Sequence, residues 1–445
     1  MQVSRLMMFA KSRRLTPVLC LSMALGGLVV SGSPTSAQEA LSLHDLVSRV
    51  VSDHVRIKAG ESRVEASRKD EDAAGGGWAP DVTLTTSYGF ERQNNASGSD
   101  TSMPPREGSL SLSQTLWDFG STNAAIDRAE LLRQQTEHTL ESTRQNLMVE
   151  AINAYLELSR ARRVMGFAQG SVENLKRQLD LENTRIERGA GVSTDRLQAK
   201  SQLAGAMSRL VRAEGALKRA RNRYRSVYGS VPDADVKLPL PKSPEALFPP
   251  TLEEAVIMGA SSNPQLLASL DATSIAKSDV DASKAAELRP TIDLTLESTW
   301  KEDVGGTVGY EQEQLAKVEL SYTFDTSFAN FNRLDATRSR AIVANNEYLQ
   351  VRLDIEERVR NAWSSLETAK RNAAHLNDQA DIAAEFLDRA RKERLQGERS
   401  LIDILAGETS LINAKSDAAS AETDVLIASF SVLAAIGKLD MSALQ

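Results

Sequence analysis

Cysteine is almost absent from this sequence: Cys20 is the single example among 445 residues. It lies in residues 1–37, which have the pattern of a secretory signal, with a basic start, an apolar run over 15–30 and small residues at 35–37. A membrane anchor is the alternative, but this run is short for the roughly 20 residues that span a bilayer. We expect cleavage, and a mature chain with no disulfide, no thiolate metal site and no cysteine nucleophile.

Basic blocks are also absent from the mature chain. The formal charge is −7, and the signal carries four basic and no acidic residues, so the mature charge is −7 minus 4, or −11. An acidic exported protein of this kind is a poor nucleic-acid binder, and we expect no such partner. After the signal there is no apolar run of about 20 residues, so we expect no membrane-spanning helix.

The sequence lacks a recognisable catalytic or metal motif. Nucleotide-binding loops, nucleophile elbows and H-E-x-x-H pairs are missing. The four histidines are scattered without ligand spacing: His44, His54, His138 and His375. We therefore expect no catalytic residue, no metal, no cofactor and no enzymatic activity.

Proline is missing from two long tracts, 106–231 and 291–445, and both show helical periodicity. Residues 123–187 run without a strong helix breaker and would extend about 98 Å as one helix, at 1.5 Å per residue. Such a helix must lie against other long helices. Glycines interrupt each tract, which predicts two helical hairpins with tips at 189–195 and 397–403.

The two halves of the chain match at a constant offset of 208 residues. Asn153-Ala154-Tyr155 aligns with Asn361-Ala362-Trp363, and the tip glycines and the aspartates that follow them align as well. We interpret this as an internal duplication, with a first repeat at 38–228 that opens with a helix over 43–71. A proline-rich linker at 229–250 joins it to a second repeat at 251–445.

Each half also contains two segments with a period of two, which predicts strands with one apolar and one polar face. The predicted strands are 82–90, 109–117, 291–300 and 315–324, in two hairpins separated by polar loops. In 109–117, leucines alternate with Ser and Thr. We expect this strand to have an unpaired edge.

Two interpretations account for the apolar strand faces. One is a sheet packed on the helices; the other is a membrane barrel, whose strands have this length and alternation. Eleven of the 21 aromatic residues lie in 78–119 and 300–331, near strand ends, as interface girdles require. The predicted interface aromatics are Trp117, Phe119, Trp300, Tyr322 and Phe324. Four strands cannot close a barrel, so two or three subunits would have to share it.

The chain resembles the TolC family of bacterial outer-membrane efflux and secretion ducts over its whole mature length. The motifs that carry the resemblance are SQTLWDFGS at 113–121, the NAY/NAW repeat, GAGVSTD at 189–195, GERSLID at 397–403 and Asn263-Pro264. The resemblance implies a homotrimer whose twelve strands form one barrel in outer-membrane lipid. The helices would then form a periplasmic tunnel.

The resemblance also assigns roles at the tips. Arg399 matches a latch residue, Thr194 and Asp195 match its partners, and Asp403 matches an acidic ring at the tunnel mouth. Two positions depart from the family pattern: Ala406 stands where an aspartate is usual, and Arg394 stands where a tyrosine is usual. The tips would also dock an adaptor, through Gly189, Gly191, Val192, Ser193, Gly397, Ser400 and Leu401. A simpler interpretation is that the negative charges of Asp195 and Asp403 only stabilise the N-terminus of the helix that follows each tip.

The function expected from the resemblance is a passive exit duct. It would dock with a periplasmic adaptor (membrane fusion) protein and an inner-membrane ABC or RND-type pump. Type I protein secretion is favoured over export of small toxic compounds, because the run from 361 to 405 and the absence of a lipidated cysteine point that way. The alternative is a periplasmic coiled-coil protein with a structural or adhesive role and no pore.

Overall fold

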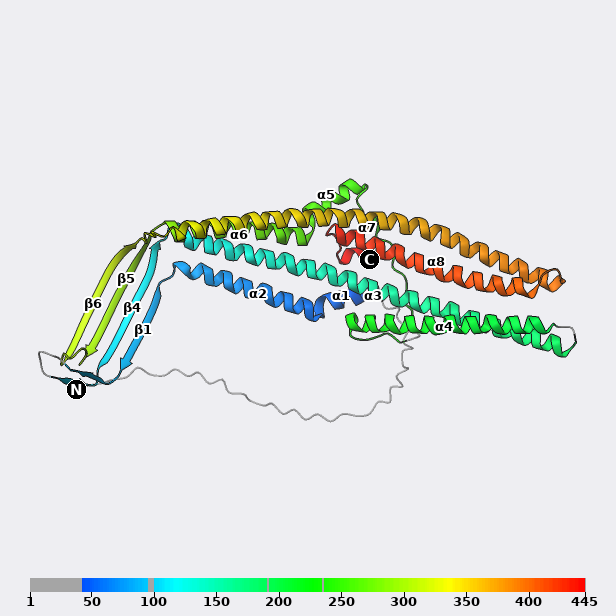
Figure 1. Cartoon of the computed structure of the whole chain (residues 1–445), viewed down its shortest axis with the longest axis horizontal. Coiled ribbons are helices and arrows are strands. Elements are labelled where there is room, and N and C mark those ends of the chain that lie inside the picture. The colour runs from blue at the N-terminus through cyan, green and yellow to red at the C-terminus, as the bar shows by residue number, and fades with distance from the viewer. Residues whose placement is uncertain (1–41, 95–99, 190–191, 234–235, 445) are drawn as a thin grey trace, which may run out of the picture. The chain divides into compact units, whose positions relative to one another are not determined.

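The computed structural model describes residues 42–94, 100–189, 192–233 and 236–444. The predicted signal segment and Gly191 lie outside these ranges. Long helices make up most of the described chain (Figure 1). The helices are α1 Leu43–Asp53, α2 Val55–Gly75, α3 Ser121–Glu187, α4 Ser193–Tyr228, α5 Leu252–Ser262, α6 Pro264–Leu288, α7 Ala329–Gln396 and α8 Leu401–Ala435, with short 3-10 turns at Gly76–Trp78, Glu245–Leu247 and Met441–Leu444.

The two predicted hairpins are present. α3 has 67 residues and α7 has 68, so each extends about 100 Å at 1.5 Å per residue. α3 packs along α4 and α7 along α8, and α8 also packs on α3. The expected helix over 43–71 is instead two helices. His54 separates them, because its backbone is extended and its ring accepts a hydrogen bond from the Arg56 amide, 3.2 Å away.

Four antiparallel strands form one sheet in the order β1-β4-β5-β6. Their bounds are β1 Asp81–Tyr88, β4 Arg106–Trp117, β5 Thr291–Glu302 and β6 Tyr310–Ser321. The expectation of an unpaired edge on the 109–117 strand was wrong: β4 pairs with β1 on one side and β5 on the other. In the described part of the chain, the open edges belong to β1 and β6.

All four strands differ from the prediction at one end or both: β1 ends at Tyr88 rather than 90, β4 begins at Arg106 rather than 109, and β5 ends at Glu302 rather than 300. β6 begins at Tyr310 rather than 315, because the Glu and Gln residues before 315 continue the hydrogen-bonded ladder with β5. The strand ends at Ser321, opposite Thr291, rather than at 324. The supposed polar loop at 91–107 contains a small hairpin, β2 Glu91–Gln93 with β3 Thr101–Met103. These additional strand residues are mostly polar, so hydrophobic alternation could not show them.

The connecting segment between the halves is fastened to α3. Tyr155 donates to the Pro239 carbonyl at 2.8 Å, Ser159 to the Leu238 carbonyl at 3.1 Å, and Arg162 to the Val236 carbonyl at 2.6 Å. The main hydrophobic core gathers here, around fully buried residues of α3 such as Leu147, with α1, α8 and the end of α4.

The Asn263-Pro264 motif joins α5 to α6. The Asn263 side chain accepts from the Gln265 amide at 2.9 Å, which caps α6, and donates to the Ala435 carbonyl at the same distance. Gly437 passes so close that a Cβ atom there would lie 2.6 Å from the Cα of Asn263. The motif therefore holds the end of α8 against the start of α6.

Of the described helices, α8 is long and apolar enough to cross a membrane by length and composition. More than half of its most apolar window is buried against the rest of the chain. That packing is typical of a core helix in a bundle.

Candidate functional site

The sheet has one apolar and one polar face, and the strand register shows this directly. Residues directly opposite one another in an antiparallel pair share a face. The apolar face joins Val82, Leu84, Leu110, Leu112, Ile292, Leu294, Leu296, Val318 and Leu320. The side chains on its outer strands are uncovered, since Val82, Val318 and Leu320 are each 64% exposed, and none of the nine is fully buried. The sheet is therefore not packed on the helices through this face.

The opposite face carries hydroxyl and charged groups. Thr115 on β4 donates to Asp293 on β5 at 2.9 Å, and Lys317 pairs with Glu319 at 2.6 Å along β6. Charged and hydroxyl groups need hydrogen-bond partners, so this face requires contact with water. Such a face suits a water-filled lumen, while the apolar face suits lipid.

Aromatic side chains lie at both ends of the apolar face. Trp117 and Ile292 are register partners at the end next to the helices, and Trp300 lies at the other end of β5, opposite Gly108. Ile292 and Trp300 are eight residues apart, or about 26 Å along a strand. A membrane barrel has an apolar band about 25 Å tall between its aromatic girdles.

A β-bulge in β4 determines the direction of Trp117. The register shifts between Thr115 and Trp117, so that two residues of β4 oppose Ile292. With a regular ladder, Trp117 would share the polar face with Ser113 and Thr115. The bulge moves Trp117 to the apolar face. Sequence alternation alone did not reveal this.

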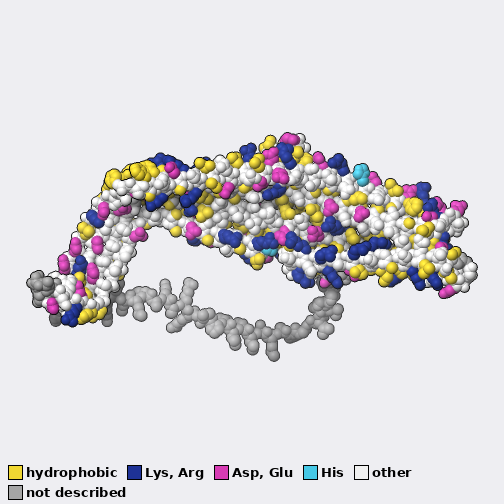
Figure 2. Space-filling view, in the orientation of Figure 1, with side chains coloured by type: hydrophobic (Ala, Val, Ile, Leu, Met, Phe, Trp, Pro, Cys, Tyr) yellow, Lys and Arg dark blue, Asp and Glu magenta, His cyan; other side chains and the backbone are white. Residues whose placement is uncertain are grey.

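Further aromatics lie where the strands join the long helices. Phe119 contacts Trp117 at a ring distance of 6.0 Å, and Tyr322 contacts Phe324 at 4.5 Å. Phe324 is 81% exposed. All five predicted interface aromatics therefore lie at strand ends or just beyond them, and hydrophobic side chains are visible in this region in Figure 2.

Two aspartates form the strand-to-helix connections. Asp118 accepts from the amides of Gly120 and Thr122 before α3, and Asp325 accepts from those of Ser327 and Asn330 before α7. The Ser327 hydroxyl, followed by the backbone amides, lowers the pKa of Asp325 to about 2. Each aspartate thus holds an ionised carboxylate at the start of a long helix, where the helix dipole favours it.

The hairpin tips turn at the predicted glycines. Gly189 and Gly397 have φ values of 78° and 85°, a region that favours glycine. At the second tip, Gly397 donates to the Arg394 carbonyl and Glu398 to the Glu393 carbonyl, both at 3.1 Å. This is a Schellman motif, which ends α7 and releases the chain into the turn.

The predicted docking residues differ in exposure. Gly189, Val192, Ser193, Gly397 and Ser400 are exposed at the tips. Leu401 is not, because it is only 2% exposed. It packs with Leu405 against α3 and α4, through Val172, Leu175, Ala199 and Ala206. Its role within the chain is to hold the two hairpins together, so it offers no surface for an adaptor.

The predicted gate residues all lie at the tips. Thr194 is exposed, and Asp195 and Asp403 lie in the first turns of α4 and α8, in agreement with the helix-start reading. Within its own chain, Arg399 forms an ion pair with Glu393 at 2.5 Å, and its guanidinium lies 5.4 Å from the centre of the Phe386 ring. A link from Arg399 to Asp195 would need another subunit and stays a prediction.

Two buried glutamates near the tips were missed by the sequence reading. Glu182 on α3 is 1% exposed and accepts from Gln178, Arg185 and Arg394 at 3.2 to 3.4 Å. Glu408 on α8 is 6% exposed and pairs with Arg391. Glu408 borders a cavity of about 510 Å³ that is also lined by Arg177, Arg185, Arg391 and Arg394, and the last of these pairs with Glu182. No pattern distinguishes these glutamates from those on solvated helix faces.

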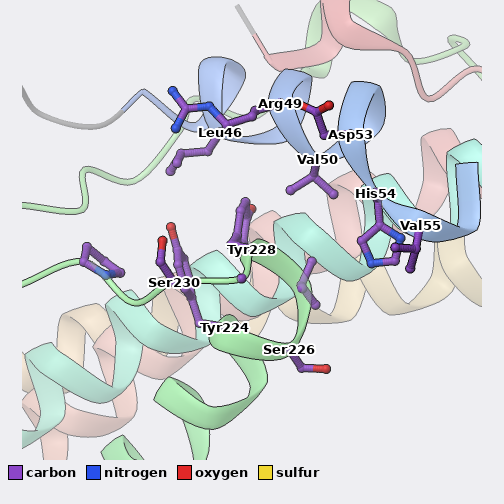
Figure 3. A pocket seen from close by; sticks show the side chains of 13 residues that line it. Leu46, Arg49, Val50, Asp53, His54, Val55, Tyr224, Ser226, Tyr228 and Ser230 are labelled. Atoms are coloured by element: carbon purple, nitrogen blue, oxygen red, sulfur yellow. The ribbon is translucent and has the colours of Figure 1, made fainter. Parts of the chain in front are cut away.

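A second cavity of about 460 Å³ lies between α1 and the end of α4 (Figure 3). Tyr224 and Tyr228 stack there at a ring distance of 4.2 Å, opposite Val50 and His54. Burial lowers the pKa of His54, and the nearby Arg56 adds to this. Across the residues with assigned coordinates, no group of three or more His, Cys, Asp or Glu side chains is placed to hold a metal.

A family model with the description "Outer membrane efflux protein" matches residues 46–230 and 259–438. The chain belongs to the outer membrane efflux protein family. The family is one of channels rather than enzymes, and it places the chain in the bacterial outer membrane with its long helices as a periplasmic tunnel. The expected fold, with a barrel and a helical tunnel, is confirmed; the alternative of a sheet packed on helices was wrong.

Individual relatives agree with this family. The chain is 26% identical to the outer membrane efflux protein BepC of Brucella suis, covering 94% of this chain and 91% of BepC. It is 24% identical to the alkaline protease secretion protein AprF of Pseudomonas aeruginosa, covering 80% and 73%. The solved structure of VceC from Vibrio cholerae shares the fold, with a TM-score of 0.76, 16% identity and coverage of 89% and 96%.

Proposed function

We propose that this protein is the exit duct of a tripartite export system and works as a homotrimer. The main observation behind this proposal is that β1 and β6 have unpaired edges in the sheet of one chain. In lipid, unpaired backbone groups at a sheet edge cost several kcal/mol each, so the sheet must close on itself. Four strands are too few, whereas three copies give twelve. β1 of one copy would pair with β6 of the next.

The helices support the same symmetry. Towards the tips they form a layer in the order α7-α8-α3-α4, with two open edges. Three copies of such a layer would close into a tunnel that continues the barrel. A coiled-coil protein without a pore would have no use for a two-faced sheet, so the duct is the better explanation.

The tips would form a gate at the periplasmic mouth. We assign Arg399 to a link with Thr194 and Asp195 of a neighbouring copy, and Asp403 to the acidic lining of the mouth. Arg394 would act differently, through Glu182 of its own chain. One exposed ion pair contributes about 0–1 kcal/mol, so three copies total a few kcal/mol, which partner binding could reverse.

This gate can be tested by conductance. Arg399→Ala or Asp195→Ala should raise the resting single-channel conductance of the purified trimer. Ser230→Ala, an exposed change away from the tips, is the control. A small resting conductance equal to that of the wild type in both variants would contradict the latch.

The exposed tip residues would dock a periplasmic adaptor, and an inner-membrane ABC or RND-type pump would supply the energy. Protein cargo is favoured, because the relative AprF is described as an alkaline protease secretion protein. The cargo can be tested by comparing the secreted proteins and the drug susceptibility of a deletion strain. Loss of a secreted protein with unchanged susceptibility is the expected result.

A further inference from the structure

Two neighbouring cavities lie at the end of α4, where the proposed duct requires none. The first is the cavity of about 460 Å³ between α1 and α4, called here the tyrosine cavity because Tyr224 and Tyr228 stack in it. The second has a volume of about 290 Å³ and is called here the basic cavity; its lining includes Lys218, Arg221, Arg225, Pro232 and Asp233. Pro232 borders both cavities, so one extended ligand can occupy them together.

The basic cavity has an excess of positive charge. The neighbouring Arg223 pairs with Glu150 at 3.1 Å, whereas Lys218, Arg221 and Arg225 have no ion pair among the described side chains. Of the described residues that line this cavity, Asp233 is the acidic one. Three cations therefore face one carboxylate, in a chain whose formal charge is −7.

Arg162 of α3 adds a fourth positive charge next to the basic cavity. Its guanidinium donates to the carbonyls of Pro232 at 3.0 Å and Asp233 at 2.9 Å, so carbonyls rather than a carboxylate satisfy it. Burial lowers the pKa of Arg162, and the nearby charge of Arg221 lowers it further. These contacts fix the linker residues that wall the cavity and leave the charge of Arg162 uncompensated.

The tyrosine cavity supplies a different kind of surface. Figure 3 shows the rings of Tyr224 and Tyr228 side by side, across the cavity from α1. Arg49, which also lines it, is exposed and has no ion pair with the described residues, while Asp53 is already paired with Lys58 at 3.2 Å. A ligand that spans both cavities must place a ring-shaped or apolar part over the tyrosines and acidic groups beside the cations.

The site lies in the middle of the periplasmic helices. Arg162 is 41 residues after Ser121 and 25 residues before Glu187, about 60 Å and about 38 Å from the two ends of α3 at 1.5 Å per residue. Figure 2 shows Lys and Arg side chains gathered over this length of α3 and α4. The linker that walls the basic cavity must lie outside the duct, because chain inside the duct would block it. This outward position rests on the proposed function.

We propose that the two cavities bind an acidic glycopeptide, namely the sugar strands of the bacterial cell wall and the short peptides attached to them. Guanidinium and ammonium groups pair strongly with carboxylates, and those peptides carry free carboxylates. The cell wall is a fixed periplasmic polymer that combines such groups with sugar rings. A simple anion would fill only the basic cavity, and an adaptor at the tips would lie several helical turns away. The site would thus anchor the tunnel to the wall.

Co-sedimentation with purified, protein-free cell-wall sacculi tests this on the full-length protein in detergent. Lys218→Gln combined with Arg225→Gln should weaken binding about tenfold, a size that two partly exposed ion pairs can supply. Asp233→Asn should strengthen binding, because it removes the opposing charge. Lys176→Gln combined with Lys200→Gln changes two exposed lysines nearer the tips by the same total charge, and this control should bind like the wild type.

Two further measurements identify the ligand. Sacculi whose carboxylates have been converted to amides should lose most of the bound protein. A soluble disaccharide-tetrapeptide from the wall should compete with intact sacculi, whereas citrate at the same concentration should not.

Four results would overturn the inference. They are unchanged binding when Lys218 and Arg225 are replaced, an equal loss in the control, equal binding to amidated sacculi, and equal competition by citrate, which would indicate a simple anion site. Bilayer conductance is recorded for the same samples, so each of these results leaves the duct intact. A wild-type protein without conductance would contradict the duct whether or not it binds sacculi.

Discussion

Arg394 on α7 donates to the carboxylate of Glu182 on α3 across 3.4 Å, at a point where that carboxylate is almost fully buried. The contact joins the two hairpins of one chain close to their tips. A buried carboxylate is tolerable only because several donors satisfy it, and here Gln178 and Arg185 supply the others. The pair therefore holds the hairpins of each subunit in a fixed relation.

Glu182→Ala should loosen this contact. Leaving the buried donors unpaired costs about 1–3 kcal/mol. Hydrogen–deuterium exchange should become faster in 174–187 and 391–405, while the sheet is unchanged. Glu173→Ala, an exposed change on the same helix, is the control and should show wild-type exchange. Equal exchange in both variants would mean that the buried pair has no structural role.

Leu401→Ala should destabilise the packing between the hairpins. Removing a buried leucine side chain costs about 2–5 kcal/mol, depending on how far the site collapses. Ile402→Ala removes a neighbouring side chain that is 50% exposed and should cost far less. Thermal unfolding followed by circular dichroism measures both. If Leu401→Ala unfolds like the wild type but loses adaptor binding, Leu401 is a docking residue after all.

The Asp325 carboxylate should make stability depend on pH in acid. Its folded pKa of about 2 lies below the usual 3.8, so its contribution is complete above pH 3.8. That contribution is lost as the pH falls from 3.8 towards 2. Asp325→Asn should remove this part of the pH dependence of the thermal midpoint. Asp70→Asn, at an exposed site on α2, should retain it; equal profiles for the two variants would contradict the assignment.

Trp117 should contact lipid. In a variant whose other three tryptophans are phenylalanine, brominated lipids should quench its fluorescence strongly. A tryptophan at the polar face, introduced as Ser113→Trp in a background without Trp117, should resist brominated lipid and respond to aqueous iodide. The reverse pattern would show that the bulge does not direct Trp117 to the apolar face.

The long helices, the tip glycines and the two-faced strands could be predicted from the sequence, because each depends on a local pattern. Periodicity and the absence of proline predicted α3 and α7 nearly to their ends. The pairing of β4 with β5 was not predictable, since it joins segments far apart in the chain. The strand extension at Tyr310 and the break at His54 were missed because neither changes the hydrophobic pattern.

The candidate site was predicted less completely than the fold. The tip residues followed from glycine positions and the family resemblance, but the partners of their charged side chains did not. The burial of Glu182 and its contact with Arg394 of α7 are tertiary features that no local pattern in α3 indicates. Leu401 looked like a tip residue by position, and its burial depends on contacts with two other helices, α3 and α4.

Single-channel recording tests the central claim most directly. The mature protein, purified from outer membranes as a heat-modifiable trimer, is added to a planar lipid bilayer. The proposed duct predicts discrete conductance steps that disappear when the trimer is dissociated by heat. Intact trimers that insert without conductance, or recovery of the protein only as a soluble periplasmic monomer, would contradict it.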